Sequence, residues 1–368
     1  MILTNFWWLI VWTIIGGLLL NYLSPKERIT VLGKEKNTWT PFATYIFITP
    51  LIIWGGFRKN FGDTEHYRKT FHEIGGSLSQ FGEFYDGLNK DKFFYSLEYL
   101  FKVFFGDNDI LFFLLLALFQ IVIISNLFRK YSTNYWLSMF IFIASTDYLS
   151  WVFNGVRQFL AVTMIYAATS CILKKQFIRV LIIILIASRF HGSALLMIPV
   201  VFIIQGRVLN RKTIFSTLLS VVLLVYIGSF TSILETLLAD TQYTNVVSDW
   251  QSFNDDGMNP IRALIFSVPS ILVFLGIKNI RYENDPVINM AANASLITTA
   301  ISIVAVGTSG IFIGRLPIYT GVYAYGILLP WAIDHIFTEQ SAKMIKAIAV
   351  VAYCLFFYYQ MHFTWGII

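Results

Sequence analysis

The chain has 368 residues, of which 57% are hydrophobic and only 13% are charged, and its formal net charge is +6. A soluble domain is typically about 45–50% apolar and about 25% charged, so this composition excludes a soluble globular protein and indicates an integral membrane protein. The excess of cations could suggest nucleic-acid binding, but the cations are sorted between alternate loops, and we therefore expect no nucleic-acid partner.

Apolar segments long enough, or nearly long enough, to cross a bilayer follow one another along the whole chain, since a span needs about 20 apolar residues. They cover residues 5–23, 40–56, 110–128, 135–152, 156–173, 177–188, 192–205, 213–237, 261–277, 287–309, 316–337 and 347–365. The first segment lacks a basic start and a cleavage site, so we interpret it as a span and not as a removable signal peptide. The pattern predicts an all-α polytopic protein with about 11–12 transmembrane helices in one domain, residues 1–368.

Two regions depart from simple spans. Segments 177–188 and 192–205 are each too short to cross a bilayer, and they flank residues 188–192. We interpret the pair as a tight hairpin of short or broken helices. Segment 93–106 carries Glu98 and Lys102 among apolar residues, which is typical of a helix lying at the membrane interface.

The distribution of Lys and Arg predicts the orientation, because cytoplasmic loops carry an excess of cations. Six loops, near residues 26–36, 129–130, 174–179, 207–212, 278–285 and 334–346, hold 16 cations and six acids. If these loops are cytoplasmic, the spans alternate consistently and both termini lie outside. The long loop 57–109, the loop 238–260 and short turns near residues 153, 190 and 312 then lie outside as well.

Four arginines stand alone at the outer ends of predicted spans: Arg157, Arg189, Arg262 and Arg315. An arginine at bilayer depth costs at least about 2.5–3.5 kcal/mol, so it usually faces a wet cavity or a partner. Guanidinium groups suit phosphate oxygens because they bind two at once and keep their charge. The four arginines therefore suggest an anion site. The alternative is that they extend to lipid headgroups, or pair with Asp147 or Glu235.

Arg157 and Arg315 are the preferred anion ligands of the four. Each follows a glycine closely and opens a predicted helix, and a helix N-terminus attracts anions. His191 lies at the apex of the short hairpin, beside Arg189, where it could take a proton near neutral pH or donate to a diphosphate. The alternative for His191 is a hydrogen-bonded structural role.

In the long loop, Asp63 and Glu65 are candidate carboxylates for general-base work. Asp63 is preferred, because a glycine–aspartate pair just after a span can hold the carboxylate at the membrane surface. Aromatic residues of this loop could stack on sugar faces, namely Tyr67, Phe81, Phe84 and Tyr85. The alternative for most of these residues is a solvated loop.

The sequence predicts neither a metal site nor a cofactor. Asp255 and Asp256 could suggest a metal-bound nucleotide-sugar site, but the expected outer location argues against it, since nucleotide sugars are cytoplasmic. Nucleotide-binding motifs, zinc-ligand spacings and nucleophile elbows are absent from the sequence. The two cysteines, Cys171 and Cys354, lie inside apolar runs and suggest neither a metal site nor a disulfide framework.

Several strings of the sequence, in this order, resemble the EpsG family of Wzy-like polysaccharide polymerases. They are Gly56–Arg58 with Gly62, Asp63 and Tyr67, then Asn154–Gln158 with Ala161, then Arg189–Ser193, and finally Gly314–Leu316. Each string is short, so the specificity lies in their order and membrane side. Together with the span count, the resemblance covers nearly the whole chain, whereas the loop 238–260 matches none of the family's strings.

The resemblance implies a metal-independent glycosyltransferase with a GT-C-like membrane architecture in a bacterial cytoplasmic membrane. Its donor and acceptor would be undecaprenyl-diphosphate-linked repeat units, joined at the outer face, with the lipid tails between the spans. Loops 57–109 and 238–260 would face the glycans. The resemblance also leaves room for a flippase and a chain-length regulator as partners.

Mapped onto that chemistry, the residues fall into two groups. The predicted catalytic residues are Arg157, Arg315, Asp63 and His191, where the arginines stabilise the diphosphate and Asp63 or His191 accepts the proton. The predicted substrate-binding residues are Arg189, Arg262, Arg58, Tyr67, Asn154 and Gln158. The alternatives are a flippase or transporter for the same lipids, a ligase that transfers the glycan to another acceptor, and a membrane acyltransferase.

Overall fold

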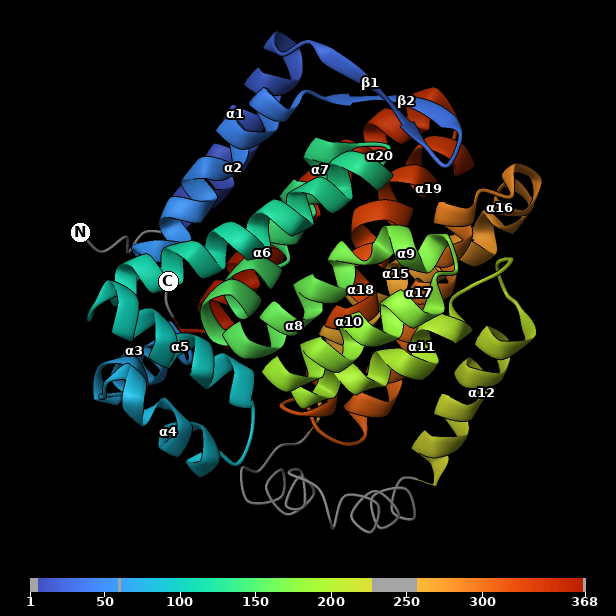
Figure 1. Ribbon diagram of the computed structural model, residues 1–368. Helices are drawn as coiled ribbons and strands as arrows, with labels where there is room; N and C mark the ends of the chain where they lie inside the picture. The colour runs from blue at the N-terminus through green and yellow to red at the C-terminus, as the bar shows by residue number, and fades with distance from the viewer. Residues whose placement is uncertain (1–5, 59–60, 227–256, 367–368) are drawn as a thin grey trace. The chain divides into compact units, whose positions relative to one another are not determined.

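The structure is a computed structural model, and it describes residues 6–58, 61–226 and 257–366 (Figure 1). The chain forms two compact units: Met1–Leu195 together with Glu339–Ile368, and Leu196–Thr338. Both units are built from apolar helices, which confirms an all-α polytopic fold. The sequence suggested one transmembrane domain, residues 1–368.

Within the described residues, four helical stretches are long and apolar enough to cross a membrane: Asp109–Tyr131, Pro286–Val306, Ile313–Ile336 and Glu339–Thr364. Two bent pairs bring the number to six if each pair is one span: Tyr135–Ala144 with Tyr148–Asn154, and Pro260–Leu275 with Ile277–Glu283. Other expected spans are apolar helices of 10–17 residues, among them Trp7–Leu23 and Pro41–Gly56. Counting the four short apolar helices as spans as well gives ten within the described residues, against the expected 11–12.

The first unit begins with α1 (Trp7–Leu23), α2 (Pro41–Gly56), α6 (Asp109–Tyr131) and α7 (Tyr135–Ala144). It continues through a π-helix (Tyr148–Asn154), α8 (Val156–Ala167), α9 (Thr169–Leu173) and α10 (Phe177–Phe190), and it ends with α20 (Glu339–Tyr359) and a π-helix (Gln360–Thr364). Polar caps set the ends of these apolar helices. The Asn108 and Asn134 side chains accept hydrogen bonds from the first turns of α6 and α7. Arg129 and Lys130 lie in the last turn of α6, where cations favour the helix dipole.

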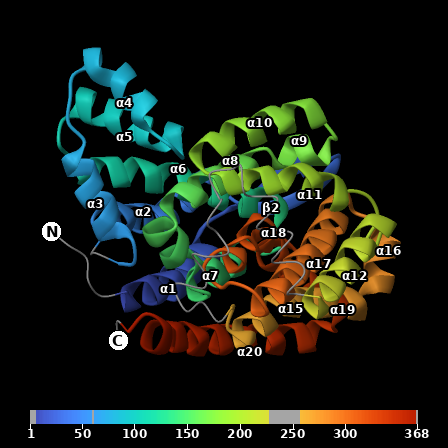
Figure 2. The same cartoon turned by 90° about the horizontal axis from the view of Figure 1, so that it is seen from below.

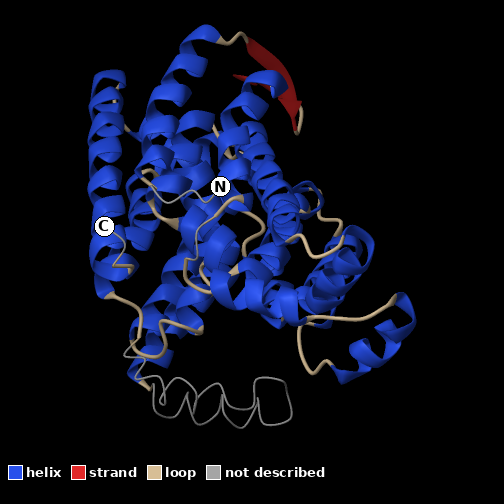
Figure 3. Ribbon diagram, turned by 90° about the vertical axis from the view of Figure 1, so that its left-hand side faces the viewer, coloured by secondary structure: helices blue, strands red, loops and turns tan. Residues whose placement is uncertain are grey.

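A β-hairpin joins α1 to α2, where we expected an irregular basic loop (Figure 3). Strands β1 (Lys26–Val31) and β2 (Lys34–Trp39) pair antiparallel around Leu32 and Gly33. Both turn residues have positive φ, +49° and +82°, as a tight two-residue hairpin requires. The hairpin is fastened to the end of α6, because Arg129 Nε donates to the carbonyl of Trp39 at 2.8 Å.

The segment 57–109, which we expected to be a long outer loop, is largely helical where the structure describes it. It contains α3 (Thr64–Glu73), a 3-10 helix (Leu78–Gln80), α4 (Phe81–Gly87) and α5 (Lys92–Phe105), which gather at one side of α6 in Figure 2. The sequence predicted only the helix near 93–106, and α5 confirms it. The other helices form because Tyr67, Phe71 and Phe94 pack with Phe112 into a buried aromatic cluster against α6. This region is therefore a packed cap whose core is shared with α6 and α8.

The second unit contains α11 (Met197–Ile203), α12 (Arg211–Val225), α15 (Pro260–Leu275), α16 (Ile277–Glu283) and α17 (Pro286–Val306). It closes with a 3-10 helix (Ile313–Arg315), α18 (Ile318–Tyr323), a π-helix (Ala324–Leu328) and α19 (Leu329–Ile336). Helix α17 is almost entirely buried, and its polar residues bind neighbouring segments. Asn293, for example, accepts from the amide of Leu209 at 3.0 Å. Such interhelical hydrogen bonds are typical of membrane helix packing.

The chain breaks where the short hairpin was expected. Helix α10 ends at Phe190, and a 3-10 helix, Gly192–Leu196, follows directly. His191 between them has extended backbone angles, φ −158° and ψ 119°. The predicted helix break at residues 188–192 is confirmed.

Candidate functional site

Arg157 lies in the first turn of α8, where it was expected to open a helix. Its Nη1 atom is 2.9 Å from Asp91 Oδ2 and donates to the Tyr95 hydroxyl, also at 2.9 Å. Its Nε atom donates to the Tyr67 hydroxyl at 3.4 Å. The guanidinium carbon lies 5.7 Å and 5.5 Å from the ring centres of Tyr67 and Tyr95. Arg157 is thus held between two phenols and a carboxylate, all from the cap formed by residues 57–109.

Asp91 is the counter-ion of Arg157 and lies at the start of α5. Its side chain is only 7% exposed, and burial raises the pKa of its carboxyl group, against the opposing effect of Arg157. The backbone N–H of Gly192 also hydrogen-bonds to Asp91. Asp91 has a left-handed backbone, with φ +50°, which is strained for a residue other than glycine. The strain is offset by the two contacts, which fix the carboxylate between α8 and the α10 break.

Glu98 lies about two helical turns beyond Asp91, on the face of α5 that also carries Tyr95. Its residue is fully buried, and neither carboxylate oxygen has a hydrogen-bond partner among the described residues. Burial raises the pKa of Glu98 to about 8, although Arg157 lowers it. Glu98 is therefore mainly protonated and neutral at pH 7, and it lies close enough to Arg157 to interact with its charge.

The predicted Gly62–Asp63 pair docks onto the predicted Asn154–Gln158 string. The Asp63 amide donates to Asn154 Oδ1 at 2.7 Å, and the Thr64 hydroxyl donates to the carbonyl of Phe153 at 2.7 Å. Gly62 has φ +51°, and a Cβ atom there would lie 2.2 Å from Asn154 Oδ1. Asp63 itself is half-buried at the start of α3. Two of the strings singled out in the sequence therefore meet, although they are some ninety residues apart.

Arg58 is fully buried, which favours a structural role over the substrate contact expected from the sequence. Its Nε donates to the carbonyl of Gly55 at 2.5 Å, and its Nη1 donates to the carbonyl of Val152 at 2.6 Å. Its guanidinium also lies over Phe113, 4.5 Å from the ring centre. Gln158 is buried too, at 4% exposure. Both residues stabilise the platform that carries Asn154 and Arg157.

The α10 break brings a third string to the same region. Phe190 packs against the aromatic cluster that contains Tyr67, and its ring lies 5.7 Å from that of Phe93. His191 Nδ1 is 2.7 Å from the Ser193 hydroxyl. Arg189, two residues before His191, is exposed. The break thus contributes the Gly192 amide, which hydrogen-bonds to Asp91. Arg189 lies in the last turn of α10, and His191 caps that helix.

The remaining predicted arginines, Arg262 and Arg315, belong to the second unit. Arg262 lies in the first turn of α15, after an Asn259 cap and Pro260, with its guanidinium 5.2 Å from the ring centre of Phe266. Arg315 closes the 3-10 helix Ile313–Arg315 and is half-buried. The two helix starts are adjacent, because a Cβ atom on Gly314 would lie 3.3 Å from the Met258 methyl group.

The other sequence predictions have different outcomes. Asp147, the suggested alternative partner for an arginine, accepts hydrogen bonds from Ser145 and Trp151, each at 3.2 Å. Glu235, Asp255 and Asp256 lie outside the described residues. In the described parts of the chain, His, Cys, Asp and Glu residues form no group of three that could hold a metal ion.

Sequence reasoning missed Asp91, Tyr95 and Glu98. A signal was present, because these residues are spaced i, i+4 and i+7 and therefore share one face of a helix. The segment was interpreted only as an amphipathic interfacial helix. What the sequence could not reveal is that this face is turned inward, toward an arginine more than sixty residues away.

Comparison with known proteins identifies the family. The model of the EpsG family matches residues 42–365, which span every string described above. No curated protein and no solved structure matches the chain. Because the family match covers nearly the whole sequence, the chain belongs to the EpsG family of Wzy-like polysaccharide polymerases, which are membrane proteins of the glycosyltransferase type.

Proposed function

We propose that this polymerase joins undecaprenyl-diphosphate-linked oligosaccharide repeat units at the outer face of a bacterial cytoplasmic membrane. The proposal rests on the surroundings of Arg157. Its guanidinium lies in the first turn of an apolar helix, is only 21% exposed, and contacts Asp91, Tyr95 and Tyr67. A fixed cation at a helix start, with phenolic hydroxyls beside it, suits the oxygens of a diphosphate.

The reaction needs charge stabilisation at the leaving group. The bond between the anomeric carbon of the donor and its diphosphate oxygen breaks, and negative charge builds on that oxygen. Preorganised cations lower the barrier of such a step because they need not reorganise as the charge develops. We assign this role to Arg157 and Arg315, with Arg189 and Arg262 in support. Undecaprenyl diphosphate leaves, and arginines supply the charge that a metal ion would otherwise supply.

Asp91 adds a step that the sequence did not suggest. Asp91 lies 2.9 Å from Arg157 and neutralises its charge, so a diphosphate must compete with this carboxylate. When the diphosphate takes Arg157, Asp91 loses its counter-ion and becomes a stronger base. The new glycosidic bond forms as the acceptor hydroxyl attacks the anomeric carbon, and its proton passes to a base. Asp63, His191 and Asp91 are the candidates for that base.

The membrane arrangement follows from the charge distribution. The six basic loops would be cytoplasmic, both termini would lie outside, and the cap of residues 57–109 would face the glycans together with loop 238–260. Donor and acceptor are both lipid-linked, so membrane lipid surrounds the reaction. A flippase that delivers the repeat units and a chain-length regulator are the further partners we propose. The two units would act as one transmembrane domain.

The test uses purified full-length protein in detergent with a lipid-linked repeat unit. Arg157→Ala and Arg315→Ala should abolish the ladder of polymer products, whereas Arg28→Ala, on the exposed β-hairpin, should leave it intact. Because Arg157→Ala leaves the buried Asp91 charge unpaired, Arg157→Ala/Asp91→Asn is made as well, to separate loss of activity from loss of folding. Wild-type ladders from both arginine variants would refute the assignment. A single transfer product from the wild-type protein would instead indicate a ligase, and transport in sealed vesicles without any product in detergent would indicate a flippase.

A further inference from the structure

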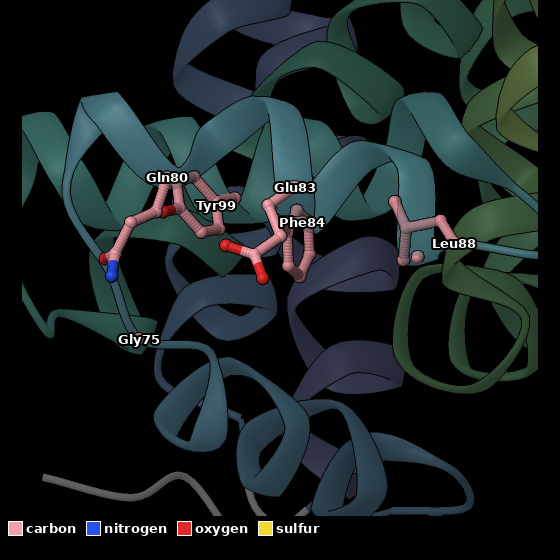
Figure 4. Close-up of a pocket in the computed structure, with 7 residues that line it drawn as sticks. Gly75, Gln80, Glu83, Phe84, Leu88 and Tyr99 are labelled. Atoms are coloured by element: carbon pink, nitrogen blue, oxygen red, sulfur yellow. The ribbon is translucent and has the colours of Figure 1, made fainter.

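A pocket of about 410 Å³ lies in the cap, between α4 and the middle of α5 (Figure 4). This volume falls within the range of small-molecule sites, about 300–1,000 Å³. Its polar groups are the side chains of Gln80 and Glu83, and its apolar surface is formed by Phe84 and Leu88, whereas Tyr99, also in the lining, is only 1% exposed. The pocket is open on the outside of the cap, since Gln80 and Glu83 are both exposed.

Local backbone structure builds this pocket. The Tyr99 hydroxyl donates to the carbonyl of Ser77 at 2.8 Å, which fixes the 3-10 helix against α5. Gly76, with φ +140°, allows this approach, because a Cβ atom there would lie 2.2 Å from the Tyr99 hydroxyl. The rings of Phe84 and Tyr99 lie 4.5 Å apart. Ser77 and Gln80 also form a reciprocal cap, so the polar edge of the pocket is rigid.

The lining indicates the chemical class of the ligand. The faces of aromatic rings carry negative charge density, which attracts the weakly positive C–H face of a pyranose. The Glu83 carboxylate accepts hydrogen bonds from hydroxyl groups, and the Gln80 amide both donates and accepts. The described lining holds the Glu83 carboxylate and no cation, which disfavours an anion such as a diphosphate. The combination therefore suits an uncharged sugar better than the leaving group.

Helix α5 links this pocket to the Arg157 site. Its first turns place Asp91 and Tyr95 against Arg157, and Tyr99, one turn after Tyr95, lines the pocket. At 1.5 Å per residue, Asp91 and Tyr99 are about 12 Å apart along the helix axis. A short oligosaccharide could span that distance with one end at each site.

We propose that the pocket formed by Gln80, Glu83, Phe84 and Tyr99 binds a sugar of the polysaccharide chain, a few sugars away from the bond being made. This inference rests on the proposed function, because it assumes that the Arg157 site handles the reacting end. The pocket would hold the chain between successive additions. Products would then stay bound long enough to grow.

The experiment measures binding without catalysis. The probe is a set of oligosaccharide fragments cut from the polysaccharide that the producing cells secrete, titrated into the purified full-length protein in detergent. Glu83→Gln and Phe84→Ala should each raise the dissociation constant about tenfold. Asp86→Asn, an exposed change on the same helix outside the lining, should leave it unchanged. Polymer ladders from the two pocket variants should be shorter than those of wild type and of Asp86→Asn.

Unchanged binding in both pocket variants would overturn the proposal. Glu83→Gln alters only an exposed side chain, so an unfolded variant would not explain a loss of binding, and an unaltered melting temperature verifies this. The two proposals fail in different ways. Wild-type protein that binds fragments through Glu83 and Phe84 but makes no polymer would refute the polymerase mechanism alone. Normal polymerisation with fragment binding insensitive to both changes would refute the pocket alone.

Discussion

The backbone amide of Asp63 donates a hydrogen bond to the side-chain oxygen of Asn154 at 2.7 Å, across 91 residues of sequence. This contact ties the start of α3 to the turn before α8. Through it, the segment that carries the candidate base Asp63 is fixed to the segment that carries Arg157. Tyr67, one turn into α3, then reaches Arg157 with its hydroxyl.

The close fit of Gly62 against Asn154 predicts a non-additive pair of substitutions. Gly62→Ala places a methyl group where only 2.2 Å is available, at a left-handed position that costs a residue with Cβ about 1–2 kcal/mol. Asn154→Ala removes the acceptor of the Asp63 amide, a loss of about 1–3 kcal/mol. The double variant should be less destabilised than the sum of the two, because Asn154→Ala also removes the clash.

Thermal unfolding of the four proteins in detergent measures this cycle. A coupling energy of about 1 kcal/mol or more between the two sites is expected for residues in contact. Gly82→Ala, at a glycine with open space around it, is the matched control and should change little. Strict additivity of Gly62→Ala and Asn154→Ala would contradict the described contact.

Much of this arrangement could be predicted from the sequence, because spans and helix breaks are marked by residues that are neighbours in the chain. Apolar length predicted the spans, and Gly–Asp, Asn–Gly and His–Gly pairs marked the breaks, so Asp63, Arg157 and His191 were found at helix ends. The pairing of those ends could not be predicted, because it depends on long-range packing of Tyr67, Phe94 and Phe112. The β-hairpin was missed because the cations Lys26, Arg28 and Lys34 led us to interpret the segment as a basic loop, and the turn at Leu32–Gly33 was overlooked.

The ion pair between Arg157 and Asp91 predicts opposite effects on binding and turnover. In Asp91→Asn the competing carboxylate is gone, so a diphosphate should bind Arg157 more tightly, on the order of tenfold. If Asp91 is also the base, turnover should fall by about 100-fold or more, the usual contribution of a general base. Farnesyl diphosphate serves as the binding probe, and ladder formation measures turnover.

Asp107→Asn provides the control, since Asp107 pairs with Lys102 at the far end of α5 and is half exposed. It should change neither quantity. Weaker diphosphate binding in Asp91→Asn would mean that Asp91 orients Arg157 and does not compete for it. Tighter binding with normal turnover would leave Asp63 or His191 as the base.

Buried Glu98 predicts a pH-dependent stability. The folded protein keeps the Glu98 proton up to about pH 8, whereas the unfolded chain loses it near the ordinary value of 4.5. Between these values the unfolded state binds fewer protons, so the free energy of unfolding falls as pH rises, by at most about 1.4 kcal/mol per pH unit. Glu98→Gln cannot titrate and should lose this dependence.

The measurement is the difference in melting temperature between Glu98→Gln and wild type, from pH 5 to pH 9. The difference should increase in favour of the variant up to about pH 8 and then level off. Arg157 and Tyr95, which interact with Glu98, are present in both proteins, so their titration largely cancels. A flat difference for Glu98→Gln would mean that its carboxyl is solvated.

The orientation in the membrane predicts which residues a membrane-impermeant maleimide reaches in intact cells. In a background with Cys171→Ser and Cys354→Ser, Gly82→Cys introduces a thiol into the cap, at an exposed position with open space around it. It should be labelled from outside, because the proposed orientation places the cap after a span that begins in the cytoplasm. Glu35→Cys replaces a side chain on β2 of the hairpin that is 64% exposed, and it should react only after the membrane is permeabilised.

The second unit is tested with Tyr282→Cys, at a side chain that is 91% exposed near the cations Lys278 and Arg281. This thiol should behave like Glu35→Cys and remain protected in intact cells. Labelling of Glu35→Cys and Tyr282→Cys from outside, with Gly82→Cys protected, would place the Arg157 site on the cytoplasmic side. Flipped lipid-linked repeat units could not reach it there, because their sugars lie outside. Arg157 would still suit a diphosphate in that case, but the substrate would have to be a glycan lipid that has not yet crossed the membrane.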